Sequence, residues 1–424
     1  MLTIRQITDN KDEIIRRLSK RNADFTSAID AVIRLDEQRR ACQNTMNQAQ
    51  SEINSISKQI GTMFQQGNNT GAGELKIKTG TLKEEIQKLE NELAVIEIKI
   101  KDILVTIPNA PHDSVPAGKS SEDNVEVESG GVMPVLDAGA MAHWDLAKKY
   151  NIIDFDLGNK ITGAGFPCYI GKGAKLQRAL ISFFLDEAEK AGYTEILPPF
   201  MVNEESGFGT GQLPDKEGQM YHVTLDNLFL VPTAEVPVTN LYRDVILDSS
   251  EMPVKNTAYT PCFRREAGSY GKLVRGLNRV HQFDKVEIVQ IQHPDNSYEA
   301  LKEMVAHSVG LLKKLQLPYR VVHLCGGDMG FASACTYDLE VFAAAQKIWL
   351  EVSSVSNFES FQSNRLKLRF KDKGDKKTQL AHTLNGSALA LPRIVACILE
   401  NNQKPGGIVI PEVLRKYTGF DIIS

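Results

Sequence analysis

The feature that most constrains the fold is a pair of apolar heptad repeats near the N-terminus. Residues 32–63 and 75–103 both place apolar side chains at alternating steps of three and four. A Gly- and Asn-rich stretch, residues 64–75, lies between them and is typical of a turn. Because sustained heptads pair helices along their apolar stripes, the sequence predicts a hairpin of two antiparallel helices. The repeat positions are Val32, Leu35, Arg39, Cys42, Met46, Ala49, Ile53, Ile56, Ile60 and Met63, then Leu75, Thr79, Leu82, Ile86, Leu89, Leu93, Ile96, Ile100 and Ile103.

A helix of about 32 residues would be roughly 48 Å long, which exceeds a typical globular helix. Gln, Lys, Glu, Asn and Ser dominate the remaining faces of both predicted helices. These polar faces favour a coiled-coil arm that projects from the body of the protein. The alternative is a helical bundle buried in a larger core.

The rest of the chain has a different pattern. A Pro-rich linker follows residue 107, and strand-like runs then begin at residues 194, 228, 286 and 319, with an amphipathic helix over 176–191. Since several of these strands follow one another without a helix between them, we expect an antiparallel sheet flanked by helices, an α+β fold. The predicted domains are residues 1–109, containing the arm at about 32–103, and residues 110–424.

Composition restricts the function only weakly. The net charge is −4, from 49 basic and 53 acidic residues, so nucleic-acid binding would need a local positive surface. Six cysteines without a C-x-x-C pair indicate free thiols in a reducing compartment. No apolar run approaches the ~18 residues of a membrane span. These features predict a cytoplasmic protein with no membrane segment.

The common nucleotide-binding fingerprints are missing from the sequence, so an ATP site would have to be built from side chains on strands. Residues 259–287 are the strongest candidate, because two strand-like pieces flank a loop rich in Gly, Arg and Lys. Alternation places Arg264 and Glu266 on one face of the first piece, and Phe283 and Glu287 on one face of the second. Arg suits phosphate and an aromatic face suits a base. The alternative is a salt-bridged hairpin without a ligand.

With these motifs in view, the whole chain resembles the class II aminoacyl-tRNA synthetases and, within them, the seryl-tRNA synthetases. Motif 1 resembles the helix over 176–191 followed by residues 192–200, with Pro198 at the family's dimer interface. Motif 2 resembles residues 263–266 continued to Phe283 and Glu287, and motif 3 resembles residues 384–393. Thr233-Ala234-Glu235, and the arm combined with residues 384–387, point to serine. Ala388 and Pro392 stand where the family commonly has glycine.

The resemblance implies a role for each matching residue. Arg264 would contact the α-phosphate of ATP and Arg393 the γ-phosphate, while Phe283 would stack on adenine near Glu266. Glu351 and Ser354 would hold Mg²⁺. The full implied ATP site is Arg264, Arg265, Glu266, Phe283, Glu351, Val352, Ser353, Ser354 and Arg393. The implied serine pocket is Thr233, Ala234, Glu235, Glu287, Asn385 and Ser387, and it stays open whether Glu235 or Glu287 takes the ammonium group.

The activity implied by the resemblance is that of a serine–tRNA ligase. It would form seryl-adenylate from ATP and serine and transfer the seryl group to tRNA(Ser), with tRNA(Sec) as a further candidate. The family resemblance also implies a homodimer whose arm grips the long variable arm of the tRNA. Basic residues suited to RNA are Lys58, Lys76, Lys78 and Lys83 on the arm, and Lys272, Arg275 and Arg279 in motif 2. The alternatives are an amino acid–carrier protein ligase of the class II-like type and a non-catalytic coiled-coil protein.

Overall fold

The structure is a computed structural model of the 424-residue chain, and it describes residues 1–215, 217–266 and 275–424. These residues form two compact units. The first unit comprises Met1–Ser19 and Ala23–Pro108, and the second comprises Lys20–Asn22 and Asn109–Ser424.

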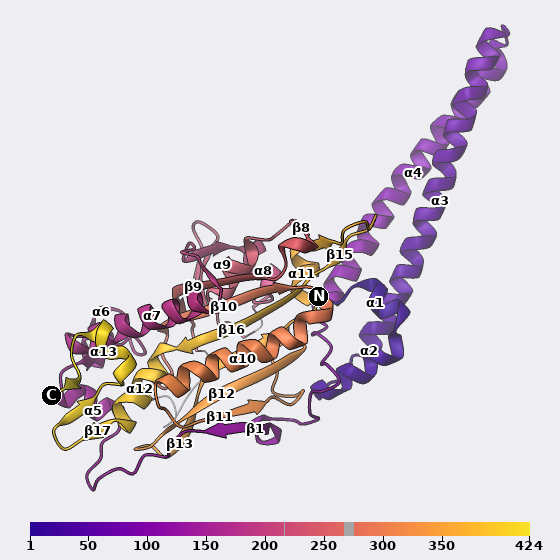
Figure 1. Cartoon of the computed structure of the whole chain (residues 1–424). Coiled ribbons are helices and arrows are strands. Elements are labelled where there is room, and N and C mark those ends of the chain that lie inside the picture. Colours follow the sequence, from indigo (N-terminus) through magenta and orange to yellow (C-terminus); the bar gives the residue numbers. More distant parts are fainter. Residues whose placement is uncertain (216, 267–274) are drawn as a thin grey trace. The chain divides into compact units, whose positions relative to one another are not determined.

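Two long helices dominate the first unit, α3 (Thr26–Gln65) and α4 (Asn69–Leu104), which run side by side (Figure 1). They contain 40 and 36 residues, so both are longer than expected, and α3 extends over about 60 Å at 1.5 Å per residue. Every predicted heptad position is buried or half-buried, whereas most other positions are exposed. This pattern confirms the paired helices and is inconsistent with a helical bundle buried on all sides.

The polar exceptions in the repeat are satisfied within the helices. Arg39 donates to the carboxylate of Asp36 at 2.8 Å, and Arg40 donates to the same buried carboxylate at 2.7 Å. Thr79 donates its hydroxyl to the backbone oxygen of Leu75 at 2.9 Å. Two short helices, α1 (Ile4–Asp9) and α2 (Lys11–Leu18), precede the pair.

An eight-stranded sheet forms the centre of the second unit. Its strand order is β1-β11-β12-β13-β16-β10-β9-β4, and all neighbours are antiparallel except β9 and β4. This arrangement confirms the α+β fold with an antiparallel sheet. The strands are β1 (Val125–Gly130), β4 (Thr194–Glu195), β9 (Val254–Phe263), β10 (Gln282–Gln292), β11 (Tyr319–His323), β12 (Cys335–Ala343), β13 (Ile348–Asn357) and β16 (His382–Ala390).

Helices cover the two faces of the sheet unequally. Three long helices lie over one face (Figure 1), namely α7 (Lys172–Lys190), α10 (Ser297–Lys314) and α12 (Leu391–Asn401). Their apolar side chains join those of the strands in one large core. On the opposite face, Ala234 and Val238 of the α9 region (Glu235–Asn240) pack against Ala258 of β9 and Val289 of β10. Several side chains that the sequence predicts to bind substrates lie on this second face.

One sequence-based expectation is wrong in detail. The apolar run from residue 228 to 238 is not a single strand: β7 covers only Leu228–Leu230, and residues 235–240 form α9. Pro232 has no backbone N–H for a strand ladder, which ends the strand pairing here. The runs starting at 286 and 319 are strands, within β10 and β11.

The remaining elements are short. The helices are α5 (His143–Lys149), α6 (Phe155–Ile161), α8 (Glu204–Thr210), α11 (Phe361–Leu366) and α13 (Glu412–Thr418). The strands are β2 (Ile153–Asp154), β3 (Cys168–Tyr169), β5 (Met201–Asn203), β6 (His222–Val223), β8 (Ile246–Asp248), β14 (Arg369–Lys371), β15 (Gln379–Leu380), β17 (Gln403–Lys404), β18 (Gly407–Val409) and β19 (Ile422–Ile423). All six cysteines are free thiols. Within the described ranges, no helix combines the length and apolar character needed to cross a membrane.

Candidate active site

Strand register gathers most of the expected site residues on one face of the sheet. Glu287 of β10 lies directly opposite Ser387 of β16 and Ala258 of β9. Because side chains alternate along a strand, Phe283 shares the face of Glu287, as expected. Val355 lies opposite Gly386, which puts Ser354 on the face of Ser387. Four of the expected residues, Phe283, Glu287, Ser354 and Ser387, therefore lie on one face of the sheet.

Glu287 is the central acidic group of this surface and is almost fully buried. Its Oε2 lies 2.6 Å from the ammonium nitrogen of Lys285 and accepts the Thr233 hydroxyl at 3.2 Å. Both contacts end on Oε2, and Oε1 has no hydrogen-bond partner among the described residues. Glu287 thus presents one further oxygen to a small cationic or hydroxyl-bearing ligand.

A second buried carboxylate, Glu235, stands beside it at the start of α9. Gln362 of α11 donates to Glu235 Oε1 at 2.6 Å, and Thr383 orients Gln362 by donating to its amide oxygen at 2.7 Å. Burial, followed by the negative charge of Glu287, raises the pKa of Glu235 to about 7. Two carboxylates in one buried site favour a ligand that carries a positive charge.

The pocket is completed by small and polar groups. Ser387 is buried opposite Glu287, and its backbone oxygen accepts the hydroxyl of Ser353 at 2.7 Å. Asn385 lies on the same face, two residues earlier in β16, and Ala234 packs beneath α9. The structure therefore brings together all six residues expected to bind serine.

The prediction that Arg264 and Glu266 share one face of a strand is wrong. Strand β9 ends at Phe263, so Arg264 and Glu266 do not alternate along a strand. Arg264 still continues the ladder by one bond, since its N–H donates to the His281 oxygen at 2.9 Å. Its guanidinium lies 5.3 Å from the centre of the Phe283 ring. An arginine against an aromatic ring is consistent with the expected phosphate and adenine contacts.

Glu266 has φ +49°, a left-handed conformation that is uncommon for a non-glycine residue. Its carboxylate lies 3.2 Å from the guanidinium of Arg279, on the other side of the connection to β10. The backbone N–H of Arg265 donates to the Gln219 oxygen at 2.9 Å. Lys272, which the sequence predicts to meet RNA, lies outside the described residues.

Arg393 projects from the first turn of α12 towards β13. Its Nη1 donates to the Glu351 backbone oxygen at 2.6 Å and lies 3.4 Å from the Glu351 carboxylate. Its Nε donates to the Asn278 backbone oxygen at 3.0 Å. Two of its nitrogens are thus fixed by the protein, which orients the guanidinium. Pro392 stands at the start of α12, where a missing N–H is tolerated.

A β-bulge explains how Glu351 and Ser354 can act together. Residues three apart in a regular strand point to opposite faces, but Ser353 lies opposite Leu339 and Glu351 lies opposite Glu340, so Val352 is an extra residue. The bulge places Glu351 and Ser354 on the same face. The side chains of Val352 and Ser353 are buried, so a contact of these two residues with ATP would come from the backbone.

The donor set beside the bulge suits Mg²⁺. Glu351 and Ser354 offer a carboxylate and a hydroxyl, and Asp338 lies directly opposite Ser354 with a buried Oδ1 that has no partner among the described residues. Burial, and then the charge of Glu351, raises the pKa of Asp338 well above its ordinary value. The described residues contain no group of three or more His, Cys, Asp or Glu side chains that could hold a metal alone. Mg²⁺ commonly takes one or two protein ligands and completes its shell with phosphate oxygens and water.

Four site residues were not predicted from the sequence: Lys285, Asp338, Gln362 and Thr383. Alternation in β10 would have identified Lys285, which lies two residues before Glu287 on the same face. No local signal marks the other three, because they approach the site from other elements.

Several of the basic residues expected to contact RNA already pair with other side chains of this chain. All four arm lysines are exposed, but Lys78 pairs with Glu52 at 2.6 Å and Lys76 lies 4.8 Å from the Phe64 ring centre. In the second unit, the Arg275 guanidinium stacks 4.5 Å from the Trp144 ring centre, and Arg279 pairs with Glu266.

Comparisons with known proteins identify the family of this chain. A family model described as the seryl-tRNA synthetase N-terminal domain matches residues 1–111, and one described as the tRNA synthetase class II core domain (G, H, P, S and T) matches residues 221–402. The serine–tRNA ligase of Salinibacter ruber is 47% identical over 421 residues, which cover 99% of this chain and 98% of the relative. The solved seryl-tRNA synthetase from Pyrococcus horikoshii, complexed with ATP, has a TM-score of 0.94 and 35% identity, covering 100% of this chain and 99% of that one. The cytoplasmic serine–tRNA ligase from Naegleria fowleri, in complex with AMP, has a TM-score of 0.89 and 28% identity over 100% and 99% of the two chains.

Proposed function

The chain belongs to the seryl-tRNA synthetase family of class II aminoacyl-tRNA synthetases, and from this premise we propose that it is a serine–tRNA ligase that uses the site described above. It activates L-serine with ATP and transfers the seryl group to the 3′ end of tRNA(Ser). The observation that carries the assignment of the pocket is the buried pair of carboxylates, Glu235 and Glu287, beside Thr233 and Ser387.

The first step needs alignment and charge stabilisation more than proton transfer. The serine carboxylate is already an anion, and its oxygen attacks the α-phosphorus while the bond to pyrophosphate breaks. Arg264, held by the Pro232 oxygen at 3.3 Å, would face the α-phosphate, and Arg393 would face the γ-phosphate. Fixed guanidinium groups stabilise the developing negative charge without reorganisation. Adenine would stack on Phe283, near Glu266.

Glu351 and Ser354 would hold Mg²⁺ together with ATP. When bound there, the ion would supply positive charge that offsets the charge of the phosphates.

Selectivity for serine would come from hydrogen bonding and size. Glu287 Oε1 and Glu235 can accept from the ammonium group and from the hydroxyl, so alanine and glycine would leave buried acceptors unpaired. Buried Thr233 and Ser387 narrow the pocket against the extra methyl group of threonine. Such an arrangement discriminates more strongly against a missing hydroxyl than against an added methyl.

In the second step a ribose hydroxyl at the tRNA 3′ end attacks the seryl carbonyl, and AMP leaves. We assign the paired helices α3 and α4 to binding of tRNA(Ser), with tRNA(Sec) as a second candidate substrate, because long rods with exposed lysines suit the shape and backbone of an RNA duplex. We also propose a cytoplasmic homodimer. Exposed apolar side chains at Leu197, Phe200 and Met201, beside the edge strand β4, support the dimer surface.

The test is ATP–pyrophosphate exchange with each of the twenty amino acids, without tRNA. Exchange with serine alone is the expected result. Exchange with glycine or alanine would instead favour a carrier-protein ligase, and no exchange with any amino acid would overturn the enzymatic assignment.

A further inference from the structure

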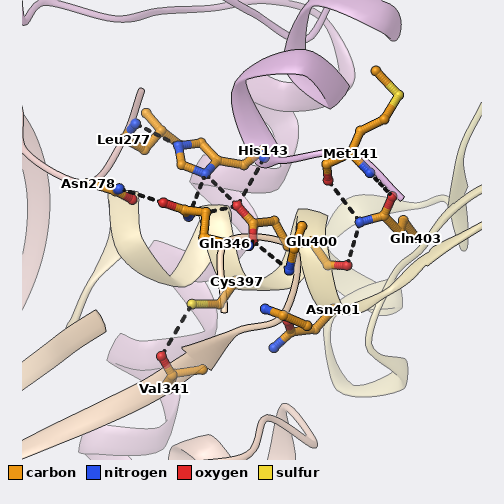
Figure 2. A network of polar contacts seen from close by, with 12 residues as sticks. Met141, His143, Leu277, Asn278, Val341, Gln346, Cys397, Glu400, Asn401 and Gln403 are labelled. Carbon is orange, nitrogen blue, oxygen red and sulfur yellow. Dashed lines mark hydrogen bonds and ion pairs between the residues drawn. The ribbon is translucent and has the colours of Figure 1, made fainter. Parts of the chain in front are cut away.

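A buried polar network joins α5, α12 and residues 277 and 278, which precede β10 (Figure 2). At its centre are His143, the first residue of α5, and Glu400 of α12, and both side chains are fully buried. The Nδ1 of His143 lies 2.8 Å from Glu400 Oε1, and the backbone N–H of His143 donates to the same oxygen at 3.0 Å.

The hydrogen-bond partners fix the tautomer of this histidine. The backbone N–H of Leu277 donates to His143 Nε2 at 2.9 Å. Since a backbone amide is always a donor, Nε2 accepts and the ring hydrogen resides on Nδ1, which donates to Glu400. One imidazole therefore connects the α12 carboxylate to the segment that enters β10.

Glu400 is saturated with donors. Its Oε1 also accepts the Gln346 side-chain amide at 2.8 Å, and its Oε2 accepts the backbone N–H groups of Ala345 and Gln346 at 3.1 and 3.2 Å. Burial alone would raise the pKa of Glu400, but the hydrogen bonds from His143 and Gln346 outweigh it and lower the pKa. An ionised carboxylate, which only accepts, satisfies all of these donors at once.

The network reaches the ATP site through Asn278. The Asn278 side chain donates to the Gln346 amide oxygen at 2.7 Å, and its backbone oxygen accepts Arg393 Nε at 3.0 Å. The segment also lies very close to the imidazole: a Cβ on Gly276, which has φ +67°, would be 2.3 Å from His143 Nε2. Residues 275–278 are therefore seated directly on His143.

We propose that His143, Glu400 and Gln346 form a positioning device that holds residues 275–278 and, through the Asn278 oxygen, aims Arg393 at ATP. The three residues act through others and touch no reacting atom. This role rests on the proposed function, because it assigns Arg393 to the triphosphate.

Two substitutions of His143 separate its contact with Glu400, made by Nδ1, from its contact with the Leu277 N–H, made by Nε2. His143→Asn retains an amide donor near the Nδ1 position but has no acceptor near Nε2. His143→Gln places an amide oxygen near Nε2, where it can accept the Leu277 N–H. His307→Asn is the matched control, since His307 is a largely buried histidine on α10, outside the network. Gln346→Leu removes the link to the Asn278 side chain and keeps the His143–Leu277 bond.

Two readouts are needed. Amide hydrogen exchange at Leu277 reports the hydrogen bond from the Leu277 N–H to His143, and it can be measured whether or not the protein is active. We expect faster exchange in His143→Asn, and protection close to that of the parent in His143→Gln, Gln346→Leu and His307→Asn. In serine-dependent pyrophosphate exchange, we expect the KM for ATP to rise about tenfold in His143→Asn and in Gln346→Leu, on the order of one lost hydrogen bond, with the KM for serine unchanged.

If the Leu277 amide in His143→Asn is as well protected from hydrogen exchange as in the parent, His143 does not hold residues 275–278, and the proposal is overturned. Equal increases in the KM values for ATP and serine would show a general loss of structure, and would also overturn the positioning role. If the parent protein shows no serine-dependent pyrophosphate exchange, the proposed function fails. Amide hydrogen exchange at Leu277 still decides whether His143 holds the Leu277 N–H. If His143→Asn does not fold, Gln346→Leu decides through the KM for ATP.

Discussion

The raised pKa of Glu235 makes serine binding sensitive to pH. With a pKa of about 7, the carboxylate is about 90% ionised at pH 8 and about 10% ionised at pH 6. If the ionised form binds the ammonium group of serine, the KM for serine rises about tenfold between pH 8 and pH 6. Glu235→Gln abolishes this dependence and raises the KM at pH 8.

The same group affects stability, with a defined sign. Its pKa in the fold lies above the value of 4.5 in an unfolded chain, so ionised Glu235 destabilises the fold above pH 7. The difference of about 2.5 pKa units corresponds to about 3 kcal/mol at most. This destabilisation disappears as the pH falls from about 7 towards 4.5. Glu235→Gln, which can retain the bond to Gln362, should therefore raise the free energy of unfolding at pH 8 and not near pH 4.5.

The assays are serine-dependent pyrophosphate exchange at saturating ATP between pH 6 and pH 8, and urea denaturation of both proteins between pH 4.5 and pH 8. Glu412→Gln, which changes an exposed glutamate on α13, serves as the control and should keep the pH dependence of the parent. A KM for serine that stays constant from pH 8 to pH 6 would refute the assignment, as would a Glu235→Gln protein that is less stable than the parent at pH 8.

The remaining predictions concern the other parts of the site. Glu287→Ala should abolish serine-dependent pyrophosphate exchange, while calorimetry still detects ATP binding. It should also lower the free energy of unfolding by about 3–5 kcal/mol, because Lys285 is left buried and unpaired. Unchanged pyrophosphate exchange would contradict the assignment of the serine pocket. Glu351→Gln should raise the Mg²⁺ concentration for half-maximal exchange about tenfold or more without changing the KM for serine, and an unaltered Mg²⁺ response would contradict its role. Deletion of residues 32–103 should leave adenylate formation largely intact and abolish tRNA charging, and equal loss of both steps would contradict the separation of roles.

The arm and the central sheet could be predicted because their signals are local. Heptad spacing is a property of neighbouring turns, so every position that it predicted between Val32 and Ile103 is buried or half-buried. The sequence missed the fully buried Ala72, because it assigned the first turn of α4 to the loop. It placed the first helix too late, since Ile29 is fully buried and extends the seam by one turn before Val32. Likewise, alternation correctly put Phe283 and Glu287 on one face of β10.

The details of the site could not be predicted in the same way, because they depend on interruptions and on distant segments. A strict two-residue period separates Glu351 from Ser354, and only the bulge at Val352 puts them on one face. The same two-residue period predicted that β9 continues through Glu266. In the structure, the left-handed backbone conformation of Glu266 turns the chain away from the strand. Gln362 reaches Glu235 from a helix more than a hundred residues later, which no local pattern reveals.

Two carboxyl groups of the site, Glu235 and Asp338, each lie near another carboxylate, and this repulsion has a chemical use. Glu235 and Asp338 both have raised pKa values, in each case because of burial first and a neighbouring carboxylate second. A cation bound beside either group lowers its pKa and relieves the repulsion. The acidic side chains are thus held in place by the fold before the substrates arrive, at some loss of stability, and do not have to reorganise during the reaction. Binding of serine should therefore release protons below pH 7, and this proton release should vanish in Glu235→Gln, although the variant still binds serine at high concentration.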